Sequence, residues 1–196
     1  MPRFKWECNN NQFSCRLKCH RCAALKPDGA RCRRSTCRTT NYCWQHLRRD
    51  MHVDTTRMST IWNAGRGLFA YDPRNPKRDI FKKNKRIGWY VGEQLTRLEL
   101  DSRYPGDVTA PYGIQGNNDI ILDGACGRGY LNQANGKPHR GANAKFDGPV
   151  VNIDIGGRLI PAISVVATKN IKHATEIFID YGPQYRFDEA CTHYTK

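Results

Sequence analysis

Cysteines are crowded at one end of this chain. Seven of its nine cysteines lie within the first 50 residues, whereas Cys126 and Cys191 stand apart. A segment this short cannot bury a sizeable apolar core, so its cysteines must hold it together as disulfides or as metal ligands. The cysteine count is odd and no apolar export signal is visible at the N-terminus, which favours metal binding over a disulfide framework. We therefore predict a small zinc-stapled module over residues 1–50.

Four residues of this module have the spacing of zinc ligands. Cys43 and His46 form a C-x2-H pair, and the turn signal Pro27-Asp28-Gly29 brings two earlier cysteines toward each other. Zinc takes four tetrahedral nitrogen or sulfur ligands, so the predicted Zn²⁺ site consists of Cys22, Cys32, Cys43 and His46. Cys19 and Cys37 remain alternative ligands, and a second metal stays open. Because the ligands are local in sequence, metal loss is expected to unfold this module with little direct effect elsewhere.

The same segment carries most of the positive charge. The chain has a net charge of +14, and residues 1–50 hold twelve Lys or Arg against three Asp or Glu. Such a surface favours a polyanion, and aromatic residues among the arginines suit base stacking, so nucleosomal DNA is a predicted partner. The alternative is a purely structural module. The basic and aromatic residues are Arg31, Arg33, Arg34, Arg38, Arg48, Arg49, Tyr42 and Trp44.

The rest of the chain has the pattern of short strands separated by Gly, Pro, Asn and Asp clusters. The predicted strands cover 67–71, 87–91, 120–122, 150–155, 159–167 and 176–179. One helix is predicted over 93–103, where three leucines fall near a helical stripe. Strands and helices do not alternate, which disfavours a Rossmann fold and favours a β-rich α+β domain. No apolar run is long enough to span a bilayer, so we expect a soluble, intracellular protein without membrane contact.

Four segments of this part carry glycine- and aromatic-containing motifs, Gly65-Arg66-Gly67, Trp89-Tyr90-Val91-Gly92-Glu93, Tyr130-Leu131-Asn132 and Asp180-Tyr181-Gly182. These motifs resemble those of SET-domain protein lysine methyltransferases. They match, in order, the family's G-x-G strand, its E-Y-x-G-E strand end, its F-I-N-H-S segment with the following P-N, and its G-E-E-L-T-F-D-Y-G end. The resemblance implies a SET fold of short curved sheets with a knot-like C-terminal threading, over residues 51–187, followed by a tail over 188–196. The matching residues are 64–70, 87–93, 130–134 with 142–144, and 174–182.

The resemblance also implies the reaction and the residues that perform it. A lysine amine must be neutral to attack the methyl group of S-adenosylmethionine, which costs roughly 4 to 5 kcal/mol at pH 7. Tyr181 matches the catalytic tyrosine of the D-Y-G motif, and the substrate channel is implied to consist of Tyr90, Phe146 and Ile179. Because neither Phe146 nor Ile179 carries a hydroxyl, di- or trimethylation is expected. The alternative for each tyrosine is ordinary packing.

The cofactor segments follow from the same motifs. The implied contacts to S-adenosylmethionine come from Arg66, Gly67, Leu68, Tyr112, Asn132 and Gln133. The chain departs from the family at Gln133, where the usual residue is histidine, and at Ala134, where it is serine. The cysteine cluster that follows the D-Y-G motif in some relatives is absent, so another aromatic residue must close the channel. The candidates are Tyr185, Phe187 and Tyr194.

A lysine on a histone is the favoured substrate, since the basic chain suits chromatin. Histone tails are cationic, so they need a local acidic groove, for which the candidates are Asp101, Asp107, Asp119, Asp123 and Asp180. The alternative is a non-catalytic chromatin or nucleic-acid binding module on a SET scaffold. The predicted location is the nucleus. The zinc segment also resembles a small Cys-Cys-Cys-His motif of large DNA viruses, which suggests a viral protein acting in the host nucleus or carried in the virion.

Overall fold

The computed structural model describes most of the chain. The described residues are 3–8, 11–16, 18–106, 110–116, 120–138, 140–182, 185 and 191–195, with backbone alone for 3–8, 11 and 191–195. Three residues named above, Asp107, Asp119 and Phe187, lie outside this set, as does the side chain of Tyr194. Within the described residues, no helix is both long and apolar enough to cross a membrane.

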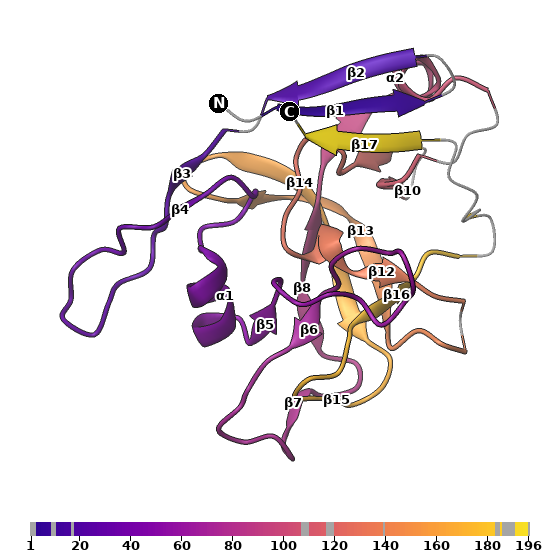
Figure 1. The fold of residues 1–196 in the computed structure, drawn as a ribbon. Helices are drawn as coiled ribbons and strands as arrows, with labels where there is room; N and C mark the ends of the chain where they lie inside the picture. The colour runs from indigo at the N-terminus through magenta and orange to yellow at the C-terminus, as the bar shows by residue number, and fades with distance from the viewer. Residues whose placement is uncertain are drawn as a thin grey trace.

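A five-stranded sheet forms the centre of the molecule (Figure 1). Its order is β12-β16-β13-β14-β8. The antiparallel hairpin of β13 and β14 carries a register shift between Asp147 and Val151. The strand β16 pairs in parallel with both β12 and β13, so a segment from near the C-terminus is inserted between two earlier strands. The strands are β8 (Arg86–Val91), β12 (Asn135–Gly136), β13 (Ala144–Asp154), β14 (Leu159–Ala167) and β16 (Phe178–Asp180).

Smaller sheets surround this centre. The pairs are β3 with β4, β5 with β6, and β7 with β15, and a three-stranded sheet has the order β10-β11-β9. The bounds are β3 (His20–Arg21), β4 (Ser35–Thr36), β5 (Val53–Asp54), β6 (Phe69–Ala70), β7 (Asp79–Phe81), β9 (Glu93–Leu95), β10 (Gly113–Gln115), β11 (Ile121–Asp123) and β15 (Ile171–Lys172). The prediction of a β-rich fold is confirmed, whereas the knot-like threading stays a prediction.

The two ends of the chain share a sheet. The strand β1 (Arg3–Cys8) pairs with β2 (Asn11–Arg16) on one side and with β17 (Cys191–Thr195) on the other, as Figure 1 shows. Residues predicted to belong to the first and the last part of the chain therefore lie side by side. The division into 1–50, 51–187 and 188–196 stays a prediction, and the backbone hydrogen bonds cross it.

The predicted helix over 93–103 is wrong in its first third. Glu93–Leu95 is strand β9, which pairs with β11, and α2 covers Arg97–Arg103. Thr96 separates the two because its hydroxyl accepts the N–H of Glu99 while the Glu99 carboxylate accepts the N–H of Thr96, a capping box that starts a helix there. The expected leucine stripe is also wrong, since Leu98 is 82% exposed.

The main core draws on both predicted parts of the chain. Leu47 of α1 (Trp44–Asp50) is buried in the same cluster as Val53, Leu68 and Ile177. Next to it, the Arg48 guanidinium is bound to the carboxylate of buried Asp54 at 2.8 Å. The helix that carries a predicted metal ligand is therefore also part of the central core.

Candidate functional site

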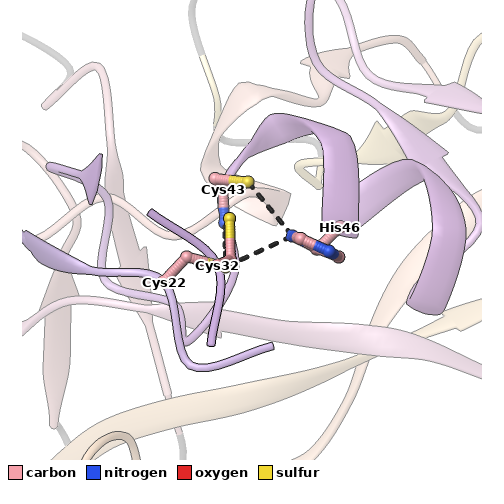
Figure 2. Close-up of side chains that lie close together, drawn as sticks. All are labelled: Cys22, Cys32, Cys43 and His46. Atoms are coloured by element: carbon pink, nitrogen blue, oxygen red, sulfur yellow. Dashed lines mark hydrogen bonds between the residues drawn. The ribbon is translucent and has the colours of Figure 1, made fainter. Parts of the chain in front are cut away.

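The four predicted zinc ligands come together beside α1. Figure 2 shows Cys22, Cys32 and Cys43 around His46, and their ligand atoms all lie within 4.8 Å of one another and are buried. His46 Nδ1 is 3.4 Å from the Cys22 sulfur and 3.3 Å from the Cys43 sulfur. Tetrahedral zinc with ordinary bond lengths separates a sulfur from a nitrogen ligand by about 3.6 Å. The residues therefore fit a zinc ion.

The surroundings favour the metal-binding forms of two of these groups, Cys32 and His46, whereas burial raises the pKa of Cys43. The backbone N–H of Cys43 donates to the Cys22 sulfur at 3.3 Å, and that of Arg34 donates to the Cys32 sulfur at 3.4 Å. The hydrogen bond from Arg34 lowers the pKa of Cys32, which favours the thiolate that binds metals. Burial lowers the pKa of His46, which favours the neutral imidazole that coordinates.

The remaining described cysteine side chains form disulfides. Cys19 is bonded to Cys37, and Cys15 is bonded to Cys126 across a sequence separation of 111. The alternative of Cys19 or Cys37 as a zinc ligand is therefore wrong, as is the view of Cys126 as isolated. The preference for metal over disulfides holds only for part of the segment, because sequence spacing cannot show which distant cysteines the fold brings together.

A cavity of about 830 Å³ opens beside α2. Its walls come from α2, from the segment around β10 with part of β11, from β8 and β13, and from the end of β16 with the residues that follow it. Among the side chains that line it are Tyr90, Asp101, Tyr112, Phe146, Asp180, Tyr181 and Tyr185.

Aromatic rings form one continuous wall of this cavity. The rings of Tyr90 and Phe146 meet edge to face with centroids 5.4 Å apart, and Phe146 stacks on Tyr181 at 6.2 Å. Tyr185 continues the row, with its ring 4.7 Å from that of Tyr181 and its hydroxyl donating to the carbonyl of Pro111 at 3.3 Å. Three of the four residues predicted for the catalytic centre and channel are thus together, and one predicted closing residue lies beside them.

The fourth predicted member, Ile179, lies elsewhere. Its side chain is fully buried in the main core and is not part of the cavity wall. It lies in β16, where it is opposite Gly136 on one neighbouring strand and Ala144 on the other. Its chain neighbour Phe178 is buried as well, so β16 is covered on both faces at this point and its residues are buried in succession rather than alternately. The expectation of di- or trimethylation therefore depends on Phe146 alone.

The hydroxyl of Tyr181 links this cavity to the segment of the third motif. It donates to the backbone carbonyl of Ala134 at 2.5 Å. Burial raises the pKa of Tyr181 well above its ordinary value, so the hydroxyl keeps its proton at neutral pH. Tyr90 behaves alike, since burial raises its pKa and its hydroxyl donates to the carbonyl of Tyr112 at 3.1 Å.

The predicted cofactor residues fall into two places. Tyr112 lies in the cavity wall, where its ring faces the Arg128 guanidinium at 4.5 Å. The others lie outside the cavity wall, and Gln133 contacts Gly67, donating its amide to the Gly67 carbonyl at 2.7 Å. Leu68 is fully buried, and its carbonyl accepts the N–H of Ile177 at 2.7 Å.

Asn132 has a structural role that the motif did not reveal. Its Nδ2 donates to the carbonyl of Val91 at 2.7 Å, and its Oδ1 accepts the N–H of Gly129 at 2.9 Å. With 2% of its surface exposed, the side chain fixes the 3₁₀ turn Leu131–Gln133 to β8. Both polar atoms of this side chain are thus bound within the protein, and a contact of Asn132 with the cofactor stays a prediction.

Glu176 of the fourth motif binds the loop that precedes the first motif, a role that was not predicted from the sequence. Its buried carboxylate accepts the Ser59 hydroxyl at 2.6 Å, the Thr60 N–H at 2.7 Å and the Thr60 hydroxyl at 2.6 Å. These bonds hold the loop that leads into Gly67. The sequence signal for this role was a charged residue, Glu176, within a motif that otherwise has the pattern of a buried strand.

Of the five candidates for an acidic groove, the structure excludes Asp123, whereas Asp107 and Asp119 lie outside the described residues. Asp123 is fully buried and bound to Arg103 at 2.6 Å and to the Tyr104 hydroxyl at 3.0 Å. Asp101 and Asp180 do line the cavity, together with the cations of Arg97 and Lys145. The described wall therefore carries both acidic and basic side chains, and the carboxylate of Asp123 is paired inside the fold.

Comparisons with known proteins bear on the fold. No family model and no curated protein matches the sequence. A chain in the crystal structure of the Chaetomium thermophilum polycomb repressive complex 2 matches with a TM-score of 0.51 and 20% identity, over 69% of this chain and 16% of that chain. This likeness supports a SET-like fold.

A second structure is of such a complex in an autoinhibited conformation bound to S-adenosylmethionine. It matches with a TM-score of 0.48 and 18% identity, over 68% of this chain and 15% of that chain. The present chain therefore spans less than a fifth of the length of these neighbours. At such identities the likeness is one of fold.

Proposed function

We propose that this protein is an S-adenosylmethionine-dependent protein lysine methyltransferase that acts on a histone. The observation that carries the proposal is the position of Tyr181. Its ring belongs to the aromatic wall of the cavity, and its hydroxyl reaches the backbone of the third SET-like motif at Ala134. A hydroxyl at such a junction can touch a lysine entering from the cavity and a methyl donor held on the other side.

The side chains of the cavity suit the preparation of a lysine amine. Tyr90, Phe146 and Tyr181 present aromatic surface, which accepts the apolar stem of a lysine and disfavours bulk water around its amine. The protonated hydroxyl of Tyr181 then orients the neutral amine. S-adenosylmethionine, when bound, supplies the electrophilic methyl group. The proposed structural metal is Zn²⁺ on Cys22, Cys32, Cys43 and His46.

A direct assay tests the proposal. We expect the purified chain to transfer labelled methyl groups from S-adenosylmethionine to a histone within a panel of histones and nucleosomes. Calorimetry should give micromolar-range affinity for the donor, with competition by its demethylated product. An absence of both heat and competition would contradict the enzymatic proposal and favour the binding module described next.

The second candidate is a non-catalytic chromatin or nucleic-acid binding module. It is favoured by the exposed Arg34 of the N-terminal segment, whose guanidinium group lies 5.5 Å from the ring of exposed Trp44. Binding of nucleosomal DNA with a steep salt dependence, and no donor binding, is its signature. Either function implies action in the nucleus, and a viral origin stays a prediction.

The number of methyl groups added is expected to depend on Phe146. We predict that the wild type makes di- or trimethyllysine, because the ring next to Tyr90 and Tyr181 carries no hydroxyl to crowd the amine. Phe146→Tyr should slow addition of the second methyl group about tenfold, equivalent to about 1.4 kcal/mol in the barrier. Mass spectrometry of a peptide at long reaction times reads this out.

The matched control is Ile179→Val. Since Ile179 packs in the core, this change should lower stability by about 0.5 to 1.5 kcal/mol and leave the product distribution alone. A wild-type product that stops at one methyl group while the enzyme is still active would contradict the open-channel prediction.

A further inference from the structure

Arg38 and Gln133 connect the cysteine-rich module to the segment of the third motif. Arg38 donates from one guanidinium nitrogen to the side-chain oxygen of Gln133, and from the other to the carbonyl of Gly129 at 3.4 Å. One residue further, the backbone N–H of Thr39 donates to the carbonyl of Arg128 at 2.8 Å. This stretch of the module therefore lies directly against the backbone that precedes the 3₁₀ turn.

Gln133 also contacts the backbone of the first motif. Its Nε2 donates to the carbonyl of Gly67 at 2.7 Å and to the carbonyl of Thr55 at 2.8 Å, while its Oε1 accepts from Arg38. One amide thus joins three segments. A neutral imidazole has one donor and one acceptor, so the histidine usual at this place in the resembled family cannot make all three contacts.

Arg38 carries its charge in a largely buried position, which costs desolvation free energy. It was predicted to belong to a phosphate-binding surface, but it is largely buried. Burial, together with the nearby charge of Arg128, lowers its pKa to about 10. A cation kept there needs its acceptors, because an unpartnered buried charge is strongly destabilising. Its contacts with Gln133 and Gly129 therefore hold the surrounding segments in one arrangement.

A disulfide and a backbone hydrogen bond join the loop that carries Arg38 to the segment around the predicted metal ligand Cys22. Cys37 next to it is bonded to Cys19, and the carbonyl of Asn41 accepts the N–H of Ala23 at 2.8 Å. Ala23 directly follows a predicted metal ligand. A continuous chain of contacts thus leads from the metal cluster through Arg38 and Gln133 to the backbone of the first motif.

We propose that Arg38 and Gln133 are positioning residues that make affinity for the methyl donor depend on the N-terminal metal module. They do so by holding the backbone at Gly67, in the segment expected to face the donor. The proposal rests on the proposed function. It gives the module a role in the reaction beyond holding a short segment together.

The test measures the donor's KM and kcat, together with its calorimetric Kd, in the full chain. Arg38→Ala and Gln133→Ala should each raise KM and Kd about tenfold, with the effect on KM rather than kcat. The double variant should be no worse than either single one, because the two side chains act through the same contact. Arg38→Lys should recover part of the affinity. Lys18→Ala, which removes an exposed lysine of the same module, should leave KM, kcat and Kd unchanged.

A second readout separates this proposal from the proposed function. Amide hydrogen exchange of residues 66–70, measured without donor, should become faster in Arg38→Ala and stay unchanged in Lys18→Ala. If the wild type binds the donor and all variants bind it equally, the coupling is refuted while the function stands. If the wild type does not bind the donor, the function fails, and unchanged exchange in Arg38→Ala then refutes the coupling on its own.

Discussion

Tyr181→Phe is expected to lower kcat for methyl transfer about 100-fold while changing affinity for the methyl donor less than about twofold. The change removes one hydroxyl, and loss of a single aligned donor at a reaction centre costs on the order of 100-fold. In the structure this hydroxyl is buried and donates to the Ala134 carbonyl at the junction between the aromatic cavity and the third motif. Single-turnover kinetics with saturating donor and histone peptide measure the effect.

The same substitution has a stability cost that must be kept apart from the catalytic one. Without the hydroxyl, the Ala134 carbonyl loses this donor, which costs about 1 to 3 kcal/mol. Rates should therefore be compared well below the melting temperature, with near-ultraviolet circular dichroism as a check of packing. Tyr185→Phe is the matched control, because its hydroxyl donates to Pro111 at the cavity rim, and its rate should stay within about threefold. Equal rates for wild type and Tyr181→Phe would show that another residue has the catalytic role.

Removal of the metal is expected to unfold more than the cysteine-rich module. Structural zinc sites of this ligand type contribute roughly 10 kcal/mol or more, which is comparable to the whole stability of a domain, about 5 to 15 kcal/mol. The contacts of α1 are the reason to expect this wider effect, because Leu47, one residue after His46, is buried in the central core, and Arg48 binds buried Asp54. Chelation should therefore abolish donor binding along with the fold of the first 50 residues.

Metal analysis and thermal unfolding check this prediction. The wild type should hold one equivalent of zinc, and Cys22→Ser should hold none and lose cooperative unfolding. The double variant Cys19→Ser, Cys37→Ser is the control within the same module, since its cysteines form a disulfide and should leave the zinc content at one. A wild type free of metal when purified under reducing conditions, or a Cys22→Ser variant with normal zinc, would overturn the assignment.

Features set by nearby residues could be predicted from the sequence. The strand over 159–167 is confirmed to the residue, since its β-branched run and flanking turns are local signals. The four predicted zinc ligands lie together for the same reason, because a C-x2-H pair and one turn bring them close, and zinc itself stays a prediction. The order of four motifs predicted a SET-like fold, which the structural likeness supports.

What the sequence could not reveal depends on contacts between distant segments. The disulfide of Cys15 and Cys126 and the contact of Arg38 with Gln133 each join residues that no local pattern relates. Ile179 was expected in the channel, but β16 is buried on both faces at this point, and the side chain packs in the main core. A motif therefore predicts which residue occupies a position in the chain. The packing of neighbouring strands decides which way that side chain faces and which group it hydrogen-bonds to or packs against.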